Sequence, residues 1–533
     1  MVASQRRIAS AVGAQILAQG GNAVDASVAT AFALAVVLPR AGNLGGGGFM
    51  LVRMAATGET IALDFRERAP AAAHADMFLN EDGEVDQQRY RYSLLATGVP
   101  GSVAGLEHAW QRFGSLPWAD LLAPAIALAE TGFEVSYDLA SALNARVERL
   151  TRHAYTRQLY YDEAARALPP GEVLRLPDLA ATLRRIAEHG RDGFYKGTTA
   201  DLIVAEMQRG NGIVTRQDLA DYQVVERRPV VGSYQGHEVI SMPPPSSGGT
   251  HLIQMLNVLE HFPLREYGSG SARSLHVLAE TMKLAYADRS QHMGDPDYHE
   301  VPVDWLVSKS YAEKLAGRID LERATPSSEI GPGTPVGYES PDTTHLSVVD
   351  ASGNAVSLTT TLNFSFGNGV AVTGAGFLLN NEMTDFSAKA GVPDGFGLLT
   401  SSANAVSAGK RPLSAMTPTI VMAGDELRLV TGSPGGSRII NVVLQNVVNV
   451  VTFGMNIAAA NHAPRVHHQW MPDVLRYEAG FSPDTLQRLA ALGHKLEPGG
   501  TQGSVQSVAR LDGLVFGAAD PRRPEAGAVG VTP

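Results

Sequence analysis

The chain of 533 residues contains no cysteine. Disulfide bonds, thiolate metal sites and a cysteine nucleophile are therefore all excluded. The sequence also lacks an H-E-x-x-H pattern, and the adjacent His467 and His468 match no known spacing of metal ligands. We interpret these two histidines as structural and expect neither a metal nor an organic cofactor. The lack of cysteine does not decide the cellular compartment.

No apolar run has the length of a membrane span. The longest one, residues 26–38, has about 13 residues and includes hydroxyl side chains, whereas a membrane helix needs roughly 20. Arg6 and Arg7 are not followed by the apolar segment and cleavage site of a signal peptide. We therefore expect a cytoplasmic protein, or a periplasmic or secreted one if a leader has been left out of this chain.

Positive charge is scarce, because 43 lysines and arginines stand against 54 aspartates and glutamates. The resulting net charge of −11 argues against a general surface for nucleic acid. Apolar residues make up 44% of the chain and charged residues 18%, which is typical of globular proteins. The length suffices for two or more domains, or for one large unit with two lobes.

Helical and strand patterns both occur. Residues 8–17 and 23–37 have the composition of helices rich in small side chains, and residues 100–320 are mostly helical in pattern. Strand patterns occur at 60–65, 370–380, 417–422 and 427–431.

Residues 342–361, DTTHLSVVDASGNAVSLTTT, predict a β-hairpin. Residues 344–349 and 355–361 favour strands, and the turn formers of 350–354 lie between them. A hairpin centred on Ser352 places Thr343 opposite Thr361. A slip of one or two residues stays open, because a five-residue loop does not fix the register uniquely.

The segment before this hairpin, residues 324–342, holds four prolines and three glycines and has no apolar periodicity. Such a segment is exposed and irregular. An exposed Asp342–Thr343 bond at the start of a strand indicates a peptide that its own threonine can cut. The freed Thr343 would combine a hydroxyl nucleophile with its own α-amine as base. An ordinary domain linker that leads into an ordinary hairpin is the alternative.

Two glycine-rich segments precede different elements. Residues 45–48 lead into a strand pattern at 49–53, whereas a phosphate-binding loop should open a helix. Close backbone packing is the better interpretation there. Residues 432–438 lie between a predicted strand and an apolar helix, so their amides either stabilise an oxyanion or form a tight turn.

Three charged side chains are candidates for binding a substrate. Arg66 stands at the end of a predicted strand, where it is either solvated or ion-paired, or else a bidentate clamp for a carboxylate. Glu382 and Asp385 are three residues apart and are either solvated or acceptors for a substrate ammonium group. Residues 388–409 are rich in glycine, proline and serine, and their length is typical of a mobile loop that covers a site.

Ser246 and Ser247 precede a predicted helix in the segment PPPSSGG and are the remaining candidates for a hydroxyl nucleophile. The segment lacks the G-x-S-x-G elbow. Capping of the helix is therefore the better interpretation.

Taken in chain order, these segments resemble the γ-glutamyltransferase family of N-terminal-nucleophile hydrolases. The resemblance runs almost end to end, through AGNLGGGGFML, DFRERAP, PPPSSGGTHL, DTTHLSVVD, GFLLNNEMTDF, RPLSAMTPTI, TGSPGGSR and APRVHHQW. TTHLSVVD together with SPGGSR is the specific combination. The resemblance implies the α+β fold of the family, an αββα sandwich in which two stacked antiparallel sheets lie between helical layers.

The family pattern implies a precursor that cuts itself between Asp342 and Thr343. A large subunit, residues 1–342, and a small subunit, residues 343–533, would then stay together as one structural unit. By resemblance, Thr343 is the nucleophile and Thr361 the threonine that hydrogen-bonds it. Gly435 and Gly436 match the glycines of the oxyanion hole.

Further matches concern the substrate. By resemblance, Arg66 clamps the α-carboxylate of a γ-glutamyl group, and Ser414 is the carboxylate-binding serine. Asn363, Glu382 and Asp385 match the residues that recognise the α-amino end.

The sequence departs from the family pattern at two positions. Transferases of the family usually have two adjacent serines where this chain reads Ser414-Ala415, so one hydrogen bond to the carboxylate is missing or replaced by water. Losing such a bond to a charged group costs roughly 1.5–3 kcal/mol. Phe396 stands where a tyrosine is common, which removes a hydroxyl from the predicted covering loop.

Three functions therefore compete. The first is transfer or hydrolysis of γ-glutamyl amides such as glutathione, with water, an amino acid or a peptide as acceptor. The second is an acylase of cephalosporin type that takes glutaryl groups, which Ala415 permits and which Glu382 and Asp385 oppose because glutaryl has no amine. The third is a non-catalytic binding protein on this fold, opposed by the intact Thr343 and Thr361.

Overall fold

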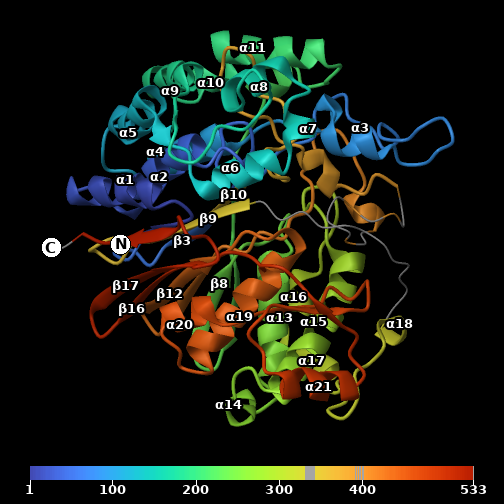
Figure 1. Cartoon of the computed structure of the whole chain (residues 1–533). Helices are drawn as coiled ribbons and strands as arrows, with labels where there is room; N and C mark the ends of the chain where they lie inside the picture. Colours follow the sequence, from blue (N-terminus) through green and yellow to red (C-terminus); the bar gives the residue numbers. More distant parts are fainter. Residues whose placement is uncertain (331–342, 390–391, 393, 395–397, 399–400, 532–533) are drawn as a thin grey trace.

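The computed structural model describes residues 1–330, 343–389, 392, 394, 398 and 401–531 (Figure 1). Within these residues the chain forms two large antiparallel sheets with helices on their outer sides. Asp342, Phe396 and most of the connector before Thr343 lie outside the described residues. None of the helices in the described part is long and apolar enough to cross a membrane.

The first sheet is built from both sides of residue 342. In spatial order its strands are β18 (Gly527–Val529), β1 (Val2–Ser4), β9 (Thr343–Val349), β10 (Ala355–Thr361), β2 (Gly47–Arg53), β3 (Thr60–Phe65) and β6 (Val225–Arg227). All neighbouring strands run antiparallel. The predicted hairpin thus occupies the centre of this sheet, flanked by β1 and β2.

The second sheet also combines strands from both parts of the chain. Its spatial order is β17 (Leu514–Ala519), β16 (Gln506–Leu511), β12 (Glu426–Gly432), β11 (Thr419–Ala423), β8 (His237–Ser241) and β7 (Val230–Tyr234). These pairs are antiparallel as well. Strands β9 and β10 pack against β12 and β16, so the two sheets lie face to face.

Each sheet has its own helical layer, as Figure 1 shows above and below the strands. The first layer contains α1 (Arg7–Ala18), α2 (Ala23–Val37), α4 (Ser102–Phe113), α5 (Trp118–Thr131) and α9 (Pro177–His189). The second contains α13 (Gly248–Leu259), α15 (Ala272–His292), α17 (Lys309–Ala316), α19 (Ile439–Val451) and α20 (Ile457–His462). This αββα arrangement is the predicted fold class.

The described chain contains further α-helices and strands. They are α3 (Gln87–Tyr92), α6 (Tyr137–Asn144), α7 (Val147–Leu150), α8 (Ala154–Tyr160), α10 (Asp192–Tyr195), α11 (Gly197–Arg209), α12 (Arg216–Ala220), α14 (Leu264–Tyr267), α16 (Val303–Leu306), α18 (Ser327–Ile330), α21 (Pro483–Ala491), β4 (Phe133–Glu134), β5 (Val173–Leu174), β13 (Val466–His467), β14 (Leu475–Tyr477) and β15 (Leu496–Pro498).

Helix α2 shows why the first layer packs closely on the sheet. Every one of its side chains is buried, and most of them are alanine or valine, so the helix needs no polar face. Its N-terminus is closed by a capping box, in which the Asn22 side chain accepts from backbone amides and Asp25 accepts from the Asn22 amide. The predicted bounds of this helix, 23–37, are confirmed.

Side chains of the β9–β10 hairpin alternate between two environments, as the period of a strand requires. Leu346 and Leu358 belong to the apolar core beneath α1 and α2. The opposite face is polar: the Ser347 hydroxyl donates to the Gln506 carbonyl on β16 at 3.0 Å, and the Ser357 hydroxyl donates to Thr431 on β12. Thr343 lies two pairs further along this face, so its side chain points between the sheets.

The glycines of residues 45–48 allow backbones to touch. A Cβ on Gly46 would stand 2.0 Å from the Thr361 carbonyl oxygen, and one on Gly48 would stand 2.4 Å from that of Thr359. The segment opens the strand β2, not a helix. Close backbone packing is therefore confirmed as the role of these glycines, in preference to phosphate binding. The glycines fix the position of the end of β10.

The strand predicted at 370–380 is wrong. These residues form a tight turn, in which the Val372 amide donates to the Phe377 carbonyl at 2.9 Å and the Leu379 amide to Val370 at 3.0 Å. Gly374 and Gly376 have φ values of 76° and 79°, in the left-handed region that interrupts a strand.

Candidate active site

Thr343 and Thr361 face each other across the ends of β9 and β10. The Thr343 hydroxyl donates to the Thr361 hydroxyl at 3.4 Å, and the Thr361 hydroxyl accepts from the Asn363 amide at 2.8 Å. The register is the one predicted from the sequence, without a slip. Thr343 is buried, with 5% of its surface exposed. It is the first described residue after the connector.

Arg66 follows β3 directly and is buried, so of the predicted alternatives the ion-paired arginine is confirmed and the solvated one is wrong. Its guanidinium forms ion pairs with Glu382 and Asp385. Its Nε donates to the Pro412 carbonyl and its Nη2 to the Leu413 carbonyl, both at 3.2 Å. The two carboxylates are likewise buried, not solvated.

The cluster around Arg66 holds more negative charge than the arginine neutralises. Glu67 brings a third buried carboxylate, with an oxygen 3.8 Å from Arg66 Nη1. Burial raises the pKa of Glu67 to about 7, and it raises the pKa values of Glu382 and Asp385 as well, although the charge of Arg66 opposes each rise. Both oxygens of Glu67 and Oε2 of Glu382 have no hydrogen-bond partner among the described residues. The cluster is therefore suited to bind a proton or an ammonium group.

Asn363 links this cluster to the threonine pair. Its Nδ2 donates to Asp385 at 2.9 Å and to the Thr384 hydroxyl at 2.7 Å. Its φ of 72° lies in the left-handed region, which asparagine tolerates better than most residues. Its Oδ1 is buried and has no partner in the described chain, so it is a further acceptor beside the site.

The segment of Ser414 and Ala415 forms another wall. The Ser414 hydroxyl accepts from the Met416 amide at 3.1 Å, and Ala415 contributes only a methyl group. The Ser247 hydroxyl donates to the Ser414 carbonyl at 2.7 Å. Within the described residues it makes no capping bond to α13, so the capping interpretation is wrong for Ser247, whose role is to hold this wall.

Gly435 and Gly436 form the turn between β12 and α19. Their φ values are 145° and 56°, so the turn requires glycine at both positions. Gly436 lines the pocket that contains Thr343. The segment therefore forms a tight turn. Its position at the pocket is compatible with backbone amides that stabilise an oxyanion.

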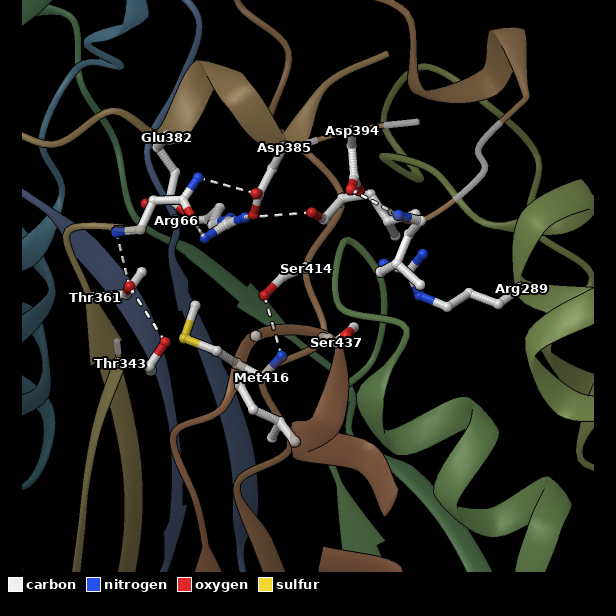
Figure 2. A pocket seen from close by; sticks show the side chains of 16 residues that line it. Arg66, Arg289, Thr343, Thr361, Glu382, Asp385, Asp394, Ser414, Met416 and Ser437 are labelled. Carbon is white, nitrogen blue, oxygen red and sulfur yellow. Dashed lines mark hydrogen bonds and ion pairs between the residues drawn. The ribbon is translucent and has the colours of Figure 1, made fainter. Parts of the chain in front are cut away.

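One pocket brings together nearly all the predicted site residues. Figure 2 shows Thr343 and Thr361 on one side, the ion pairs of Arg66 above them and Ser414 in the centre. The predicted residues that line it are Arg66, Thr343, Thr361, Asn363, Glu382, Asp385, Ser414, Ala415 and Gly436. Asp394 and Leu398 of the predicted covering loop also line it. Sequence reasoning missed Arg289, because it lies in a regular helical pattern that indicates only packing, and it named the segment 432–438 without singling out Ser437.

His345 lies next to Thr343 along the polar face of β9. Its ring nitrogens hydrogen-bond the Thr359 hydroxyl at 2.9 Å and the Ser347 hydroxyl at 3.0 Å. Burial lowers the pKa of His345 to about 3, so the folded protein holds the ring neutral. A Cβ on Gly432 would stand 2.3 Å from this ring, which explains the glycine at the end of β12.

This depressed pKa predicts a pH-dependent contribution of His345 to stability. Below about pH 6.5 the unfolded chain protonates the ring and the folded chain does not, so the stabilisation is present above pH 6.5 and is lost as the pH falls toward 3. The difference in free energy of unfolding between wild type and His345→Asn should narrow by about 1.4 kcal/mol on going to about pH 5.5. Urea titrations of both proteins at neutral and acidic pH measure it. The exposed His261→Asn is the matched control, and a gap that stays constant for His345→Asn would contradict the assignment.

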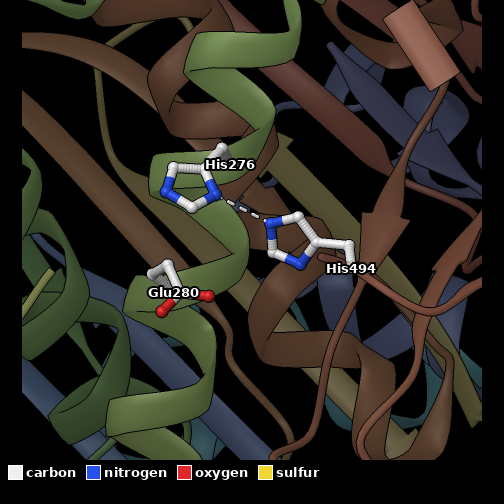
Figure 3. Close-up of side chains that lie close together, drawn as sticks. All are labelled: His276, Glu280 and His494. Carbon is white, nitrogen blue, oxygen red and sulfur yellow. Dashed lines mark hydrogen bonds between the residues drawn. The ribbon is translucent and has the colours of Figure 1, made fainter. Parts of the chain in front are cut away.

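A second group of titratable side chains lies away from the pocket (Figure 3). His276 and Glu280 on α15 face His494, and their ligand atoms lie within 4.8 Å of one another, as in a metal site. However, His276 hydrogen-bonds His494 at 2.8 Å and the Asp320 carbonyl at 2.7 Å, and the Lys283 ammonium donates to Glu280 at 2.7 Å. The group is thus satisfied by protein contacts, and it joins α15 to residue 494.

His467 and His468 also have protein partners, which agrees with a structural role. His467 contacts the side chains of Asn441 and Gln469, at 2.8 and 2.9 Å. His468 hydrogen-bonds Asp473 at 3.2 Å.

Known proteins resemble this chain over nearly its whole length. The family model described as gamma-glutamyltranspeptidase matches residues 9–530. A glutathione hydrolase proenzyme of Escherichia coli (strain K12) is 52% identical over 98% of this chain and 90% of its own length. An acylase ACY 1 proenzyme of Pseudomonas sp. (strain SE83) is 37% identical over 97% of this chain and 91% of its own.

The fold has a close counterpart among crystal structures. A cephalosporin acylase from Bacillus halodurans superposes with a TM-score of 0.87 at 29% identity, over 100% of this chain and 96% of that one. The fold comparison and the sequence comparison both cover nearly the whole chain, and both point to the same family. The chain is therefore an enzyme of the gamma-glutamyltranspeptidase family, with the αββα fold of the N-terminal-nucleophile hydrolases.

Proposed function

We propose that Thr343 is the nucleophile of a γ-glutamyl hydrolase and transferase that acts on glutathione and similar γ-glutamyl amides. The observation that carries this proposal is the arrangement of side chains around the pocket. The Thr343 and Thr361 hydroxyls lie at one side, and nearby there are more carboxylates than the single charge of Arg66 can neutralise. Such a cluster suits the α-ammonium group of a glutamyl substrate. The glutathione hydrolase relatives support the same substrate class.

Maturation comes before catalysis. The Thr343 hydroxyl attacks the Asp342 carbonyl carbon, the peptide C–N bond breaks, and an ester with a free Thr343 amine results. Water then hydrolyses the ester and leaves residues 1–342 and 343–533 as two chains. They would stay together because strands from both parts share each sheet.

Turnover reuses the same hydroxyl. Thr343 Oγ bonds to the γ-carbonyl carbon of the substrate while the Gly435 and Gly436 amides stabilise the oxyanion. The C–N bond then breaks, and the departing amine takes the proton that the hydroxyl gave up through the Thr343 α-amine. Water or an acceptor amine finally takes the γ-glutamyl group from the ester, and Thr361 orients the nucleophile throughout.

Recognition of the glutamyl group depends on the charges around it. Glu382 and Asp385, with Asn363, would bind the α-ammonium, and Oε2 of Glu382 and Oδ1 of Asn363 have no other partner among the described residues. Arg66 and Ser414 would bind the α-carboxylate. Because Arg66 is already paired with Glu382 and Asp385, a substrate carboxylate would share it with them.

The decisive experiment compares release of the same chromogenic amine from γ-glutamyl and glutaryl anilides, with and without a dipeptide acceptor. We expect the γ-glutamyl anilide to react faster, because glutaryl leaves the carboxylate cluster without its ammonium partner. Acceleration by the dipeptide would identify a transferase, and no acceleration a hydrolase. Preference for the glutaryl anilide would overturn the assignment of the substrate.

A cephalosporin-type acylase is the second candidate, and Ala415 is the observation that favours it. The relatives named as acylases share the fold and more than a quarter of the sequence. The excess carboxylates beside Arg66 oppose it, because a glutaryl group would leave them unpaired. A non-catalytic binding protein is not supported, since the family is one of enzymes.

The missing hydroxyl at Ala415 gives a prediction. Ala415→Ser should raise kcat/KM for a γ-glutamyl anilide about tenfold or more, mainly through KM, because a hydrogen bond to a charged carboxylate is restored. Steady-state kinetics on the purified variant measure the change. The 4-aminobutyryl anilide, which lacks the α-carboxylate, should react as it does with the wild type. Equal gains on both anilides would show that Ala415 does not face the carboxylate.

A further inference from the structure

Arg289 is a buried cation in the wall of the pocket that no part of the mechanism uses. It lies in the last turn of α15, with 2% of its surface exposed. Its Nε donates to the Ser247 hydroxyl at 2.9 Å, whereas its Nη1 is buried and has no hydrogen-bond partner in the described part of the chain. Figure 2 shows its guanidinium entering the pocket from the side opposite Thr343.

The charge of Arg289 is unusual for its burial. Other deeply buried arginines, such as Arg66, Arg411 and Arg465, each have a carboxylate within 4 Å. Among the described residues, Arg289 has no carboxylate within 4 Å, although the charges of Asp394 and Asp385, which line the same pocket, act on it from further away. A buried charge without a partner is costly unless something else supplies the opposite charge. Within the described residues no carboxylate bonds Arg289 directly, so its Nη1 is available to an anion that enters the pocket.

Ser247 connects Arg289 to the place where a carboxylate contact is missing. The Ser247 hydroxyl accepts from Arg289 and donates to the Ser414 carbonyl, so the guanidinium is held beside the Ser414–Ala415 segment. Ala415 cannot donate a hydrogen bond there, whereas Arg289 has a donor to spare. Arg66, in contrast, already has two carboxylates and two carbonyls as partners.

We propose that Arg289 binds the carboxylate of the acyl group, so that it takes part of the role that a second serine would have at Ala415. The proposal rests on the proposed function, because it assumes that a carboxylate-bearing acyl group occupies this pocket. It makes Arg289 a determinant of specificity for acyl groups with a carboxylate. Arg66 would then bind the same carboxylate together with Arg289, while it also holds Glu382 and Asp385 in place for the ammonium group.

The test uses the processed enzyme and three anilides that release the same amine. The γ-glutamyl anilide has both the carboxylate and the ammonium, the glutaryl anilide has only the carboxylate, and the 4-aminobutyryl anilide only the ammonium. Arg289→Gln should lower kcat/KM for the first two by about 10- to 150-fold, mainly through KM. It should change the third by less than about threefold, and Arg289→Lys should restore part of the loss. Inhibition constants of L-glutamate and 4-aminobutyrate provide the same comparison without turnover.

Equal losses on all three anilides would reduce Arg289 to a structural role, and no loss on any of them would show that it does not bind the substrate. Either result overturns the proposal. Failure of the proposed function looks different, because the wild type itself would then not prefer the γ-glutamyl anilide. If the variants do not fold, a crystal structure of the wild type with L-glutamate decides the matter. The α-carboxylate should lie within hydrogen-bond distance of Arg289 Nη1, and a carboxylate bound elsewhere would contradict the proposal.

Discussion

Thr343→Ala should remain a single uncut chain on a denaturing gel and should lose turnover by at least about 10⁴-fold. One hydroxyl serves both reactions, so one substitution stops both. The change removes only the hydroxyl and a methyl group from the end of β9, whose register is fixed by the paired backbones of β10 and β1. The fold should therefore survive, and mass spectrometry together with γ-glutamyl anilide kinetics measures the two losses separately.

The adjacent Thr344 offers a matched control. It is buried on the other face of β9, and its hydroxyl has no hydrogen-bond partner within the described chain. Thr344→Ala should be cut like the wild type and keep its activity within a few fold. Thr343→Ser, which keeps a hydroxyl, should still be cut, and it should turn over substrate more slowly than the wild type. Two chains from Thr343→Ala, ending at residue 342 and beginning at 343, would show that another group cuts the bond.

Arg66→Gln should lower stability by about 3–5 kcal/mol and weaken the binding of γ-glutamyl substrates as well. Removal of the arginine leaves Glu67, Glu382 and Asp385 buried without their cation, and breaking a buried ion pair from one side costs about that much. Burial already raises the pKa values of the three carboxyls, so between about pH 4.5 and 7 the folded protein holds protons that the unfolded chain releases. Stability from this cluster thus falls as the pH rises through that window.

Loss of Arg66 raises these pKa values further, so the gap between wild type and Arg66→Gln should widen as the pH rises from about 5 to 8. Urea midpoints at both pH values measure the gap. Arg68→Gln is the control, since Arg68 is half-buried and its Nε donates to a single carbonyl, of Gly409, at 2.6 Å. That variant should lose about 1 kcal/mol, with no dependence on pH. A smaller loss for Arg66→Gln than for Arg68→Gln would mean that the carboxylates are not held as charged groups.

Local patterns predicted the elements next to the nucleophile well. The hairpin of 343–361 was readable because two strand-favouring segments flank a five-residue turn, whereas a slip of its register stayed open until the structure paired Thr343 with Thr361. Helix α2 was readable from the many small side chains of residues 23–37. The error at 370–380 arose because apolar residues suggest a strand, whereas Gly374 and Gly376 turn the chain back within a few residues.

The burial of polar and charged side chains was predicted poorly from the sequence. Arg66, Glu382 and Asp385 are charged residues at the end of a strand and in a short helical turn, where exposure is the usual outcome. They are buried because β3 and the 3₁₀ turn at Glu382–Asp385 bring residues more than 300 positions apart in the chain into one ion-paired cluster. Ser247 was misjudged for the same reason, since its partner Ser414 lies 167 residues away.

The sequence by itself determined the hairpin, the two helices before it, the glycines that let backbones touch and the membership of a family, because each depends on residues that are neighbours along the chain. The tertiary structure alone decided which charges are buried and which of them lack a partner among the described residues. The excess of carboxylates beside Arg66, and the Nη1 of Arg289 that has no partner within the described residues, arise only when both sheets close around one pocket. Electrostatic energy depends on distance and on exclusion of water, and neither can be read from positions along a chain.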